Sequence, residues 1–190
     1  MKRIVFMICL LGGWMTCCFA QGIVFCELTL EAACRQADSE GKYVFVDCYT
    51  SWCGPCKYMS NTVFPQEKMG DYMNPKFICV KYDMEKGEGP ELAKKFGVRA
   101  YPTFVIVNPD GTIRHKLVGG GEGEQFIERV KESFDDNKAL GVLDAKYNNG
   151  DRDKAFLAQY AQVMVANYDP NAKAIVDELL KISTDEEKLS

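Results

Sequence analysis

The chain has a single histidine, His115, among its 190 residues, and a single Cys-x-x-Cys pair, Cys53 and Cys56. A structural zinc site usually takes four Cys or His ligands in two close pairs, and a Cys–His hydrolase needs a histidine as its base. Both kinds of site are therefore disfavoured, and we expect no metal. His115 itself is predicted to be an exposed residue of a strand.

Features that bind phosphate are missing as well. The chain carries 23 Lys and Arg against 27 Asp and Glu, a net charge of −4, and no basic cluster. The glycines of residues 119–123 lack the lysine and the strand-to-helix spacing of a nucleotide-binding loop. We therefore expect no nucleic-acid partner and no cofactor.

What remains is the composition of an ordinary globular protein. Hydrophobic residues make up 47% of the chain and charged residues 26%. The length favours one domain, with room for an extension, and it is sufficient to bury a core without disulfide staples.

The first twenty residues differ from the rest. Lys2 and Arg3 precede the uncharged run IVFMICLLGGWMTCCFA, which predicts a signal peptide over residues 1–20, cleaved after Ala20. A membrane anchor and a lipid-modified Cys17 or Cys18 remain as alternatives. We therefore predict that the protein is exported to the periplasm or to a similar oxidising compartment.

Residues 21–137 show the pattern of a mixed sheet covered by helices. Apolar runs predict strands, while helix caps, proline starts and glycine stops predict helices. Expected strands are residues 22–26, 43–49, 77–83, 103–107 and 112–118, and expected helices are residues 30–40, 53–61, 65–73, 90–97 and 124–134. Strand–helix–strand units come first and a hairpin with a helix comes last, so we predict an α/β fold with a mixed central sheet.

Residues 138–190 are predicted to form a helical extension of three helices, separated by residues 148–151 and 169–170. The chain ends soon after the third of these, which leaves open a longer helical region. Apolar side chains recur at helical spacing in the second helix and are expected to pack on the neighbouring helices; a ligand groove is the alternative. They are Phe156, Tyr160, Val163 and Met164.

Cys53 and Cys56 share one helix face at the expected start of a helix. The first N–H groups of a helix have no internal partner and stabilise a thiolate, so Cys53 is the expected nucleophile. Cys56 is expected to be more buried and to resolve a mixed disulfide. Pro55 suits the first turn, where its missing N–H is not needed. Half of a metal site and two inert buried thiols remain as alternatives.

The stretch WCGPCK, residues 52–57, follows VFVD and is later followed by AYPTF, residues 100–104. This combination resembles the thioredoxin family over about residues 25–136. The NTVF stretch, residues 61–64, is similar to thioredoxin-like domains of exported thiol:disulfide interchange proteins. The resemblance implies the thioredoxin fold, a central sheet flanked by helices, which here continues into the helical extension.

The resemblance assigns catalytic roles to four residues. Cys53 matches the attacking cysteine and Cys56 the resolving cysteine of a redox-active disulfide. Asp47 matches a buried acid beneath the resolving cysteine; burial is expected to raise its pKa and to let it relay the proton of Cys56. Lys81 matches the lysine that accompanies this acid.

It also assigns four residues to the binding of substrate. Pro102 matches a cis-proline beside the disulfide, and an X-Pro bond is the one peptide type that readily becomes cis. Tyr101 precedes it, where a small apolar residue is more usual, which bears on partner preference. Trp52 matches the ring that flanks the site, and Gly119 matches a glycine of the substrate groove.

The other cysteines have no role in this resemblance. Cys48 and Cys79 fall in predicted interior strands and are expected to be buried free thiols. Cys26 and Cys34 are open to a structural bridge, which the spacing alone does not establish.

The resemblance implies an exported thiol–disulfide oxidoreductase that reduces protein disulfides, because Gly-Pro between the cysteines resembles reducing thioredoxins. Its partners would be disulfide-containing proteins and an upstream thiol electron donor, with a membrane protein as one candidate. The alternatives are a docking protein, in which residues 138–190 bind the partner, and a disulfide oxidase or isomerase.

Overall fold

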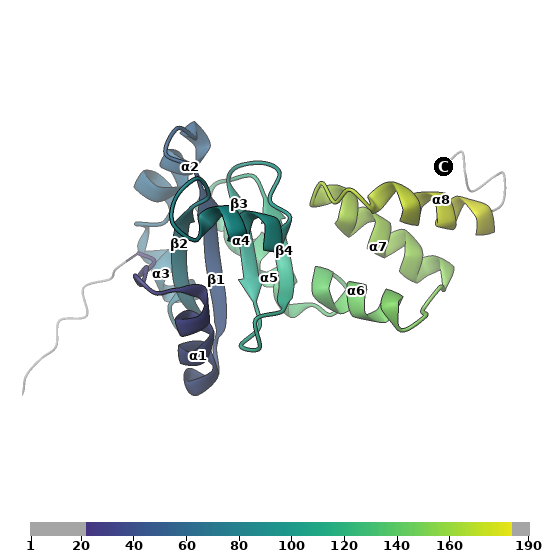
Figure 1. Ribbon diagram of the computed structural model, residues 1–190, viewed down its shortest axis with the longest axis horizontal. Coiled ribbons are helices and arrows are strands. Elements are labelled where there is room, and N and C mark those ends of the chain that lie inside the picture. The colour runs from purple at the N-terminus through teal and green to yellow at the C-terminus, as the bar shows by residue number, and fades with distance from the viewer. Residues whose placement is uncertain (1–21, 184–190) are drawn as a thin grey trace, which may run out of the picture.

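The computed structural model describes residues 22–183 (Figure 1). The predicted signal peptide, residues 1–20, lies outside this part of the chain. Four strands form one sheet in the order β2-β1-β3-β4. They are β1 (Tyr43–Tyr49), β2 (Phe77–Asp83), β3 (Thr103–Val107) and β4 (Ile113–Val118). Strand β1 runs parallel to β2 and antiparallel to β3, and β3 runs antiparallel to β4, so the predicted mixed sheet is confirmed.

Helices cover both faces of the sheet (Figure 1). One face packs against α1 (Leu30–Glu40) and α4 (Gly89–Phe96). The other face packs against the π-helical segment η1 (Met59–Val63), α3 (Glu67–Met73) and α5 (Gly123–Lys131). Two short segments complete these layers, α2 (Gly54–Tyr58) before η1 and the 3₁₀ turn η2 (Glu132–Phe134) after α5.

Local sequence signals explain where these elements begin and end. The Thr29 side chain accepts a hydrogen bond from the Ala32 N–H at 3.2 Å and caps α1. Gly41 ends α1 in the left-handed conformation, with φ 63°, where a side chain would be strained. Four phenylalanines from β1, β3, α5 and the end of η1 meet in the core, with ring centres of Phe104 and Phe126 4.8 Å apart.

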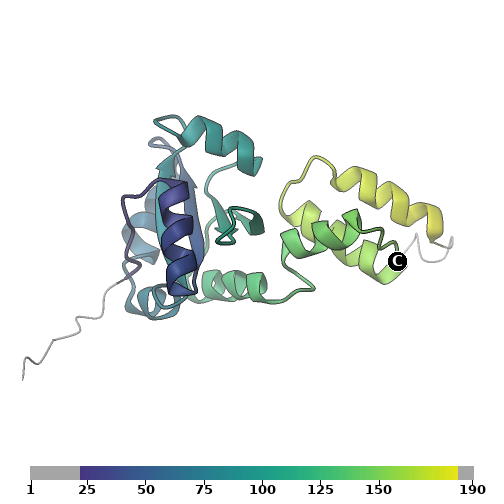
Figure 2. The same cartoon turned by 60° about the horizontal axis from the view of Figure 1, so that its bottom comes forward.

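The C-terminal region forms α6 (Leu140–Asn148), α7 (Lys154–Ala166) and α8 (Ala172–Ile182), with a small core of their own. These helices lie on the side of β4, one of the two edge strands of the sheet (Figures 1 and 2). Tyr160 and Met164 are buried in this core, as predicted. In the described part of the chain, no helix is both long and apolar enough to cross a membrane.

The structure corrects the prediction for β4. The sequence predicts that His115 is an exposed residue of the strand over residues 112–118, but His115 is 3% exposed and its neighbour Lys116 5% exposed. The reason is the helical extension. The N–H of Leu140, at the start of α6, donates to Nδ1 of His115 at 3.2 Å, and Lys116 lies within reach of the charges of Asp144 and Asp169 in the same extension.

Two further elements differ from expectation. Residues 22–26 do not form a regular strand. The backbone N–H of Ile23 donates to the Phe64 carbonyl and that of Val24 donates to Oδ1 of Asn74. The only strand-like pairing of these residues is an isolated bridge between Phe25 and Cys79. The helix expected over residues 53–61 begins as α2 but widens into the π-helical η1 at Met59.

We expect Gly141→Ala to destabilise the protein, because a Cβ at Gly141 would collide with the carbonyl oxygen of Ile113, where α6 packs on β4. Alanine favours a helix, so the loss must come from this contact; overpacking of this kind costs roughly 1–3 kcal/mol. Urea unfolding measures the change. Gly121→Ala is the matched control, since a Cβ there meets nothing. Equal stability of the two variants would contradict close packing of α6 on β4.

Candidate active site

Cys53 and Cys56 form a disulfide at the start of α2, with their Cα atoms 5.3 Å apart. Cys53 is the N-cap of α2 and stands just beyond the end of β1. Its backbone N–H donates to the carbonyl of Thr50 at 3.2 Å, which closes the turn that leads out of β1. Strand β1 therefore places the pair at one end of the sheet.

The start of α2 directs a hydrogen-bond donor at Cys53. The backbone N–H of Cys56 donates to Sγ of Cys53 at 3.1 Å. Pro55 occupies the first turn, where its lack of an N–H costs nothing. A sulfur at this position faces the positive end of the helix, which stabilises its thiolate form after reduction.

The two cysteines are equally buried, contrary to the expectation that Cys56 would be the more buried. Each is 3% exposed. The S–S bond draws the Cys53 sulfur onto that of Cys56, so neither presents its sulfur freely in the oxidised protein. Gly54 and Pro55 between them are exposed, so the surface of the turn is open to a partner.

The loops before β3 and after β4 are joined directly to each other. The Tyr101–Pro102 peptide bond is cis. The backbone N–H of Gly119 donates to the carbonyl of Pro102 at 2.8 Å. Gly119 has φ 82°, a conformation that favours glycine. Next to it, Gly120 lies against the Met59 side chain in η1 and near the Pro102 ring, so these loops reach the helix that follows the cysteines.

An aromatic pair forms the exposed rim of this region. Trp52 is 64% exposed, and its ring meets that of Tyr101 edge-on, with centroids 5.9 Å apart. The indole N–H of Trp52 donates to Oε1 of Glu85 at 3.0 Å. Sequence reasoning missed Glu85, because nothing in the loop after β2 marks it as a partner of a tryptophan 33 positions away.

Arg129 in α5 is the second residue that the sequence did not single out. Its guanidinium donates to the carbonyls of Val118, Gly119 and Gly120 at 2.7, 3.0 and 3.1 Å. The three bonds hold the loop that carries Gly119. An arginine among the charged residues of a helix carries no signal of this function, which depends on where β4 ends.

Asp47 is 2% exposed, and its Oδ1 has no hydrogen-bond partner. Burial raises its pKa to about 7, and the charge of Lys81 partly offsets this shift. Lys81 stands opposite Asp47 in the β1–β2 register, and its ammonium lies 5.5 Å from the centre of the Phe25 ring. The structure thus brings the two predicted catalytic residues into register, and the proton relay between Asp47 and Cys56 stays a prediction.

Strand alternation places Asp47 on the side of the sheet where the cysteine-bearing helix lies. Its partner in the neighbouring strand β3 is Phe104, which packs in the same core cluster as Met59 of η1. Val46 and Cys48, the neighbours of Asp47 in β1, belong to the opposite face. This orientation is the one that a role beneath Cys56 requires.

The remaining described cysteines are free thiols. Cys48 and Cys79 are buried, as predicted, and burial raises the pKa of both well above the ordinary thiol value. Cys26 and Cys34 are not bridged. Among residues 22–183, no three His, Cys, Asp or Glu side chains group together as they would around a metal ion.

A disulfide at a helix start, beside a cis-proline loop on a four-stranded mixed sheet, defines a thiol–disulfide exchange centre of the thioredoxin kind. Residues 30–133 match the family described as a thioredoxin-like domain. The chain belongs to this family of thiol–disulfide oxidoreductases, and helices α6–α8 lie beyond the matched residues.

Individual relatives point the same way. The chain is 32% identical over 118 residues to thioredoxin Y2 of Arabidopsis thaliana, covering 58% of this chain and 67% of that protein. It is 27% identical over 103 residues to the thiol:disulfide interchange protein DsbD of Pseudomonas fluorescens, covering 53% of this chain and 18% of that much longer protein. A solved structure from Bacteroides thetaiotaomicron, described as a candidate disulphide-isomerase, is 46% identical with a TM-score of 0.55, covering 60% of this chain and 94% of that chain.

We expect Asp47→Asn to remove a pH dependence of stability. The folded protein holds a proton on Asp47 up to about pH 7, whereas the unfolded chain releases it near 3.8. Stability of the oxidised wild type therefore falls as pH rises through this interval and levels off above it, by up to about 4 kcal/mol. Urea unfolding at several pH values measures this fall.

Asp38→Asn, on the exposed side of α1, is the control and should keep the wild-type profile. A wild-type fall that persists in Asp47→Asn would show that another group causes it.

Proposed function

We propose that this protein is an exported thiol–disulfide oxidoreductase that reduces protein disulfides through Cys53 and Cys56. The observation that carries the proposal is the hydrogen bond from the Cys56 N–H to Sγ of Cys53 at the start of α2. This donor favours the thiolate at Cys53, the form that attacks a disulfide. Gly54 and Pro55 between the cysteines are exposed, and the Trp52 ring next to the pair contacts Tyr101 of the loop that ends in the cis-proline.

The reaction balances two electrons and two protons. The Cys53 thiolate attacks one sulfur of the substrate disulfide, and the other sulfur leaves as a thiolate that takes up a proton. Cys56 loses its proton and attacks Sγ of Cys53, which releases the second substrate sulfur as a thiolate that takes up the second proton. The substrate is then a dithiol, and Cys53–Cys56 is the disulfide that the structure contains.

Asp47 is the group proposed to take the proton of Cys56. A carboxyl with a pKa of about 7 exchanges protons readily at neutral pH. Asp47 lies on the face of the sheet that η1 covers, and η1 directly follows the short helix α2 that bears Cys56. Lys81 is proposed to tune this acid through its charge, because it stands opposite Asp47 in β2.

The substrate is proposed to lie along Trp52, Tyr101, Pro102 and Gly119. Trp52 and Tyr101 supply an apolar rim, and Trp52 is largely exposed. The loop before β3 is tied to Gly119 by one backbone hydrogen bond, so the two segments present a common edge of backbone to an extended peptide. Tyr101 is bulky, which favours partners that are narrow next to the disulfide.

The protein is proposed to act outside the cytoplasm, most simply in a periplasm. The support is the basic start and apolar run of residues 1–20. Its partners would be disulfide-containing proteins and an upstream thiol donor that reduces Cys53–Cys56 again, with a membrane protein as one candidate. Similarity to part of the DsbD thiol:disulfide interchange protein is compatible with such exchange. The docking role of residues 138–190 stays a prediction.

Reduction is favoured over oxidation or isomerisation by the residues between the cysteines, Gly54 and Pro55, which resemble those of reducing thioredoxins. Isomerase activity is the second candidate. It is favoured by the similarity to the Bacteroides thetaiotaomicron protein that is described as a candidate disulphide-isomerase.

We expect Cys53→Ser to lose essentially all activity in reduction of insulin disulfides with dithiothreitol as donor. Cys56→Ser should instead accumulate a mixed disulfide with its substrate, because the resolving thiol is missing. Turbidity and non-reducing electrophoresis measure the two effects. Cys26→Ser is the control and should retain the wild-type rate, since Cys26 is a half-buried free thiol whose backbone N–H donates to Cys79 in β2. Wild-type activity in Cys53→Ser would show that Cys53 is not the nucleophile.

The direction of the reaction follows from the equilibrium of Cys53–Cys56 with glutathione. We expect a reduction potential near that of thioredoxin, about −270 mV, well below the values of about −180 mV for an isomerase and about −120 mV for an oxidase. Alkylation of the free thiols and mass spectrometry measure the reduced fraction at each glutathione ratio. A potential near that of protein disulfide isomerase would shift the proposal to isomerisation.

A further inference from the structure

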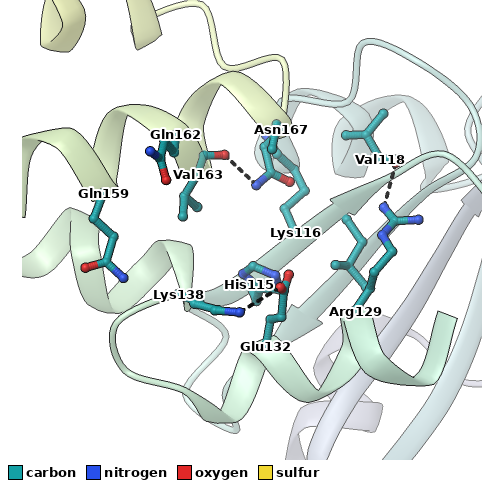
Figure 3. Close-up of a pocket in the computed structure, with 12 residues that line it drawn as sticks. His115, Lys116, Val118, Arg129, Glu132, Lys138, Gln159, Gln162, Val163 and Asn167 are labelled. Atoms are coloured by element: carbon teal, nitrogen blue, oxygen red, sulfur yellow. Dashed lines mark hydrogen bonds and ion pairs between the residues drawn. The ribbon is translucent and has the colours of Figure 1, made fainter. Parts of the chain in front are cut away.

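The side chain of Arg129 reaches from α5 to the end of β4 (Figure 3). It lines a cavity of about 300 Å³ between β4, α5, η2 and the helix α7 of the extension. Burial lowers the pKa of Arg129, and the charge of Glu132 partly offsets this shift, but an arginine keeps its proton in a protein. A half-buried charge of this kind needs hydrogen-bond acceptors.

The acceptors are three successive main-chain carbonyls at the end of β4. Nη2 of Arg129 donates to Val118 at 2.7 Å, and Nη1 donates to Gly119 at 3.0 Å and to Gly120 at 3.1 Å. Hydrogen bonds from a charged donor are stronger than those between neutral groups. The guanidinium is also a rigid, planar fork, which a lysine ammonium is not. One side chain therefore fixes the orientation of three consecutive peptide groups.

The direction of these carbonyls sets the direction of the N–H groups. In a trans peptide, the C=O and the following N–H point in opposite directions, so the N–H groups of Gly119, Gly120 and Gly121 point away from Arg129. The N–H of Gly119 accordingly donates to the carbonyl of Pro102 at 2.8 Å. In the described part of the chain, no hydrogen bond uses the N–H of Gly120 or Gly121. Both glycines are half-exposed, so the loop offers two unused donors beside the cis-proline.

The composition of the loop makes this clamp important. Residues 119–121 are three consecutive glycines, and glycine loses more conformational freedom on ordering than any other residue. A loop that is free to move must be ordered by its substrate, and the cost of ordering weakens binding. Arg129 orders the loop before the substrate arrives.

We propose that Arg129 is a positioning residue for the binding of polypeptide substrates, an inference that rests on the proposed function of Cys53 and Cys56. It holds residues 118–120 so that the N–H groups of Gly120 and Gly121 donate to main-chain carbonyls of the substrate. A polypeptide carries such carbonyls on both sides of its cysteine, whereas a small disulfide such as hydroxyethyl disulfide has none. Arg129 therefore favours polypeptide disulfides over small ones and takes no part in the exchange of thiols.

The test compares the full chain with Arg129→Met and Arg129→Lys on insulin and on hydroxyethyl disulfide. Protein that has been reduced beforehand is mixed with excess substrate, and the loss of its free thiols is followed by acid quenching, alkylation and mass spectrometry. For insulin, we expect the half-saturating concentration to rise at least about tenfold in Arg129→Met and about threefold in Arg129→Lys, with the maximal rate within about twofold of wild type. The rate with hydroxyethyl disulfide should stay within about twofold of wild type in both variants.

Lys131→Met is the matched control. It removes another cation of α5, one that pairs on the surface with Glu128 at 2.5 Å, and should behave as wild type on both substrates. If Arg129→Met does not fold, Arg129→Lys decides the question, because it keeps the charge and most of the stem but not the fork. Equal losses on the two substrates, or no loss on insulin, would overturn the role of Arg129. A wild type that reduces neither substrate would instead remove the proposed function, and this inference with it.

Discussion

The backbone hydrogen bonds along strand β1 hold the redox site together, because they decide which loops meet. In the sheet register, Cys48 of β1 stands opposite Thr103 of β3, and Thr103 stands opposite Val118 of β4. This row lies at the end of the sheet where β1 leads to Cys53, where Pro102 precedes β3, and where Gly119 follows β4. Three segments that are distant in sequence are therefore neighbours. A slip of one residue in any pair would separate them and would also move the side chains of the slipped strand to the opposite face of the sheet.

The same strand explains the unusual chemistry of Asp47. Both faces of β1 are covered, so a carboxyl placed in it has no access to water and carries an unpartnered oxygen. Such a group reduces the stability of the folded state when it is ionised. The protein therefore carries a loss of stability at neutral pH, and the proton transfer proposed for Asp47 gives this loss a function, since strongly shifted acids are common in active sites.

Much of the fold was readable from local patterns. The bounds of β1, β2, β3 and α1 agree with the prediction, because apolar runs and caps such as Thr29 and Gly41 act within a few residues. The burial of His115 was not readable, since it depends on α6, which packs on β4 from 25 residues further along the chain. Glu85 and Arg129 were missed for the same reason. Their roles come from loops that the sheet brings together, and no local motif marks them.

Arg129 has a consequence for how the molecule works as a whole. A single guanidinium holds the loop of residues 118–120, which bonds to Pro102 near the disulfide, and also forms part of the wall of the cavity beside α7. The two regions thus share one hydrogen-bonded group. By linkage, if a ligand beside α7 changes the affinity of this loop for a substrate, the substrate changes the affinity for that ligand by the same factor. The helical extension therefore borders the one side chain whose three hydrogen bonds fix the Gly119 loop of the redox domain.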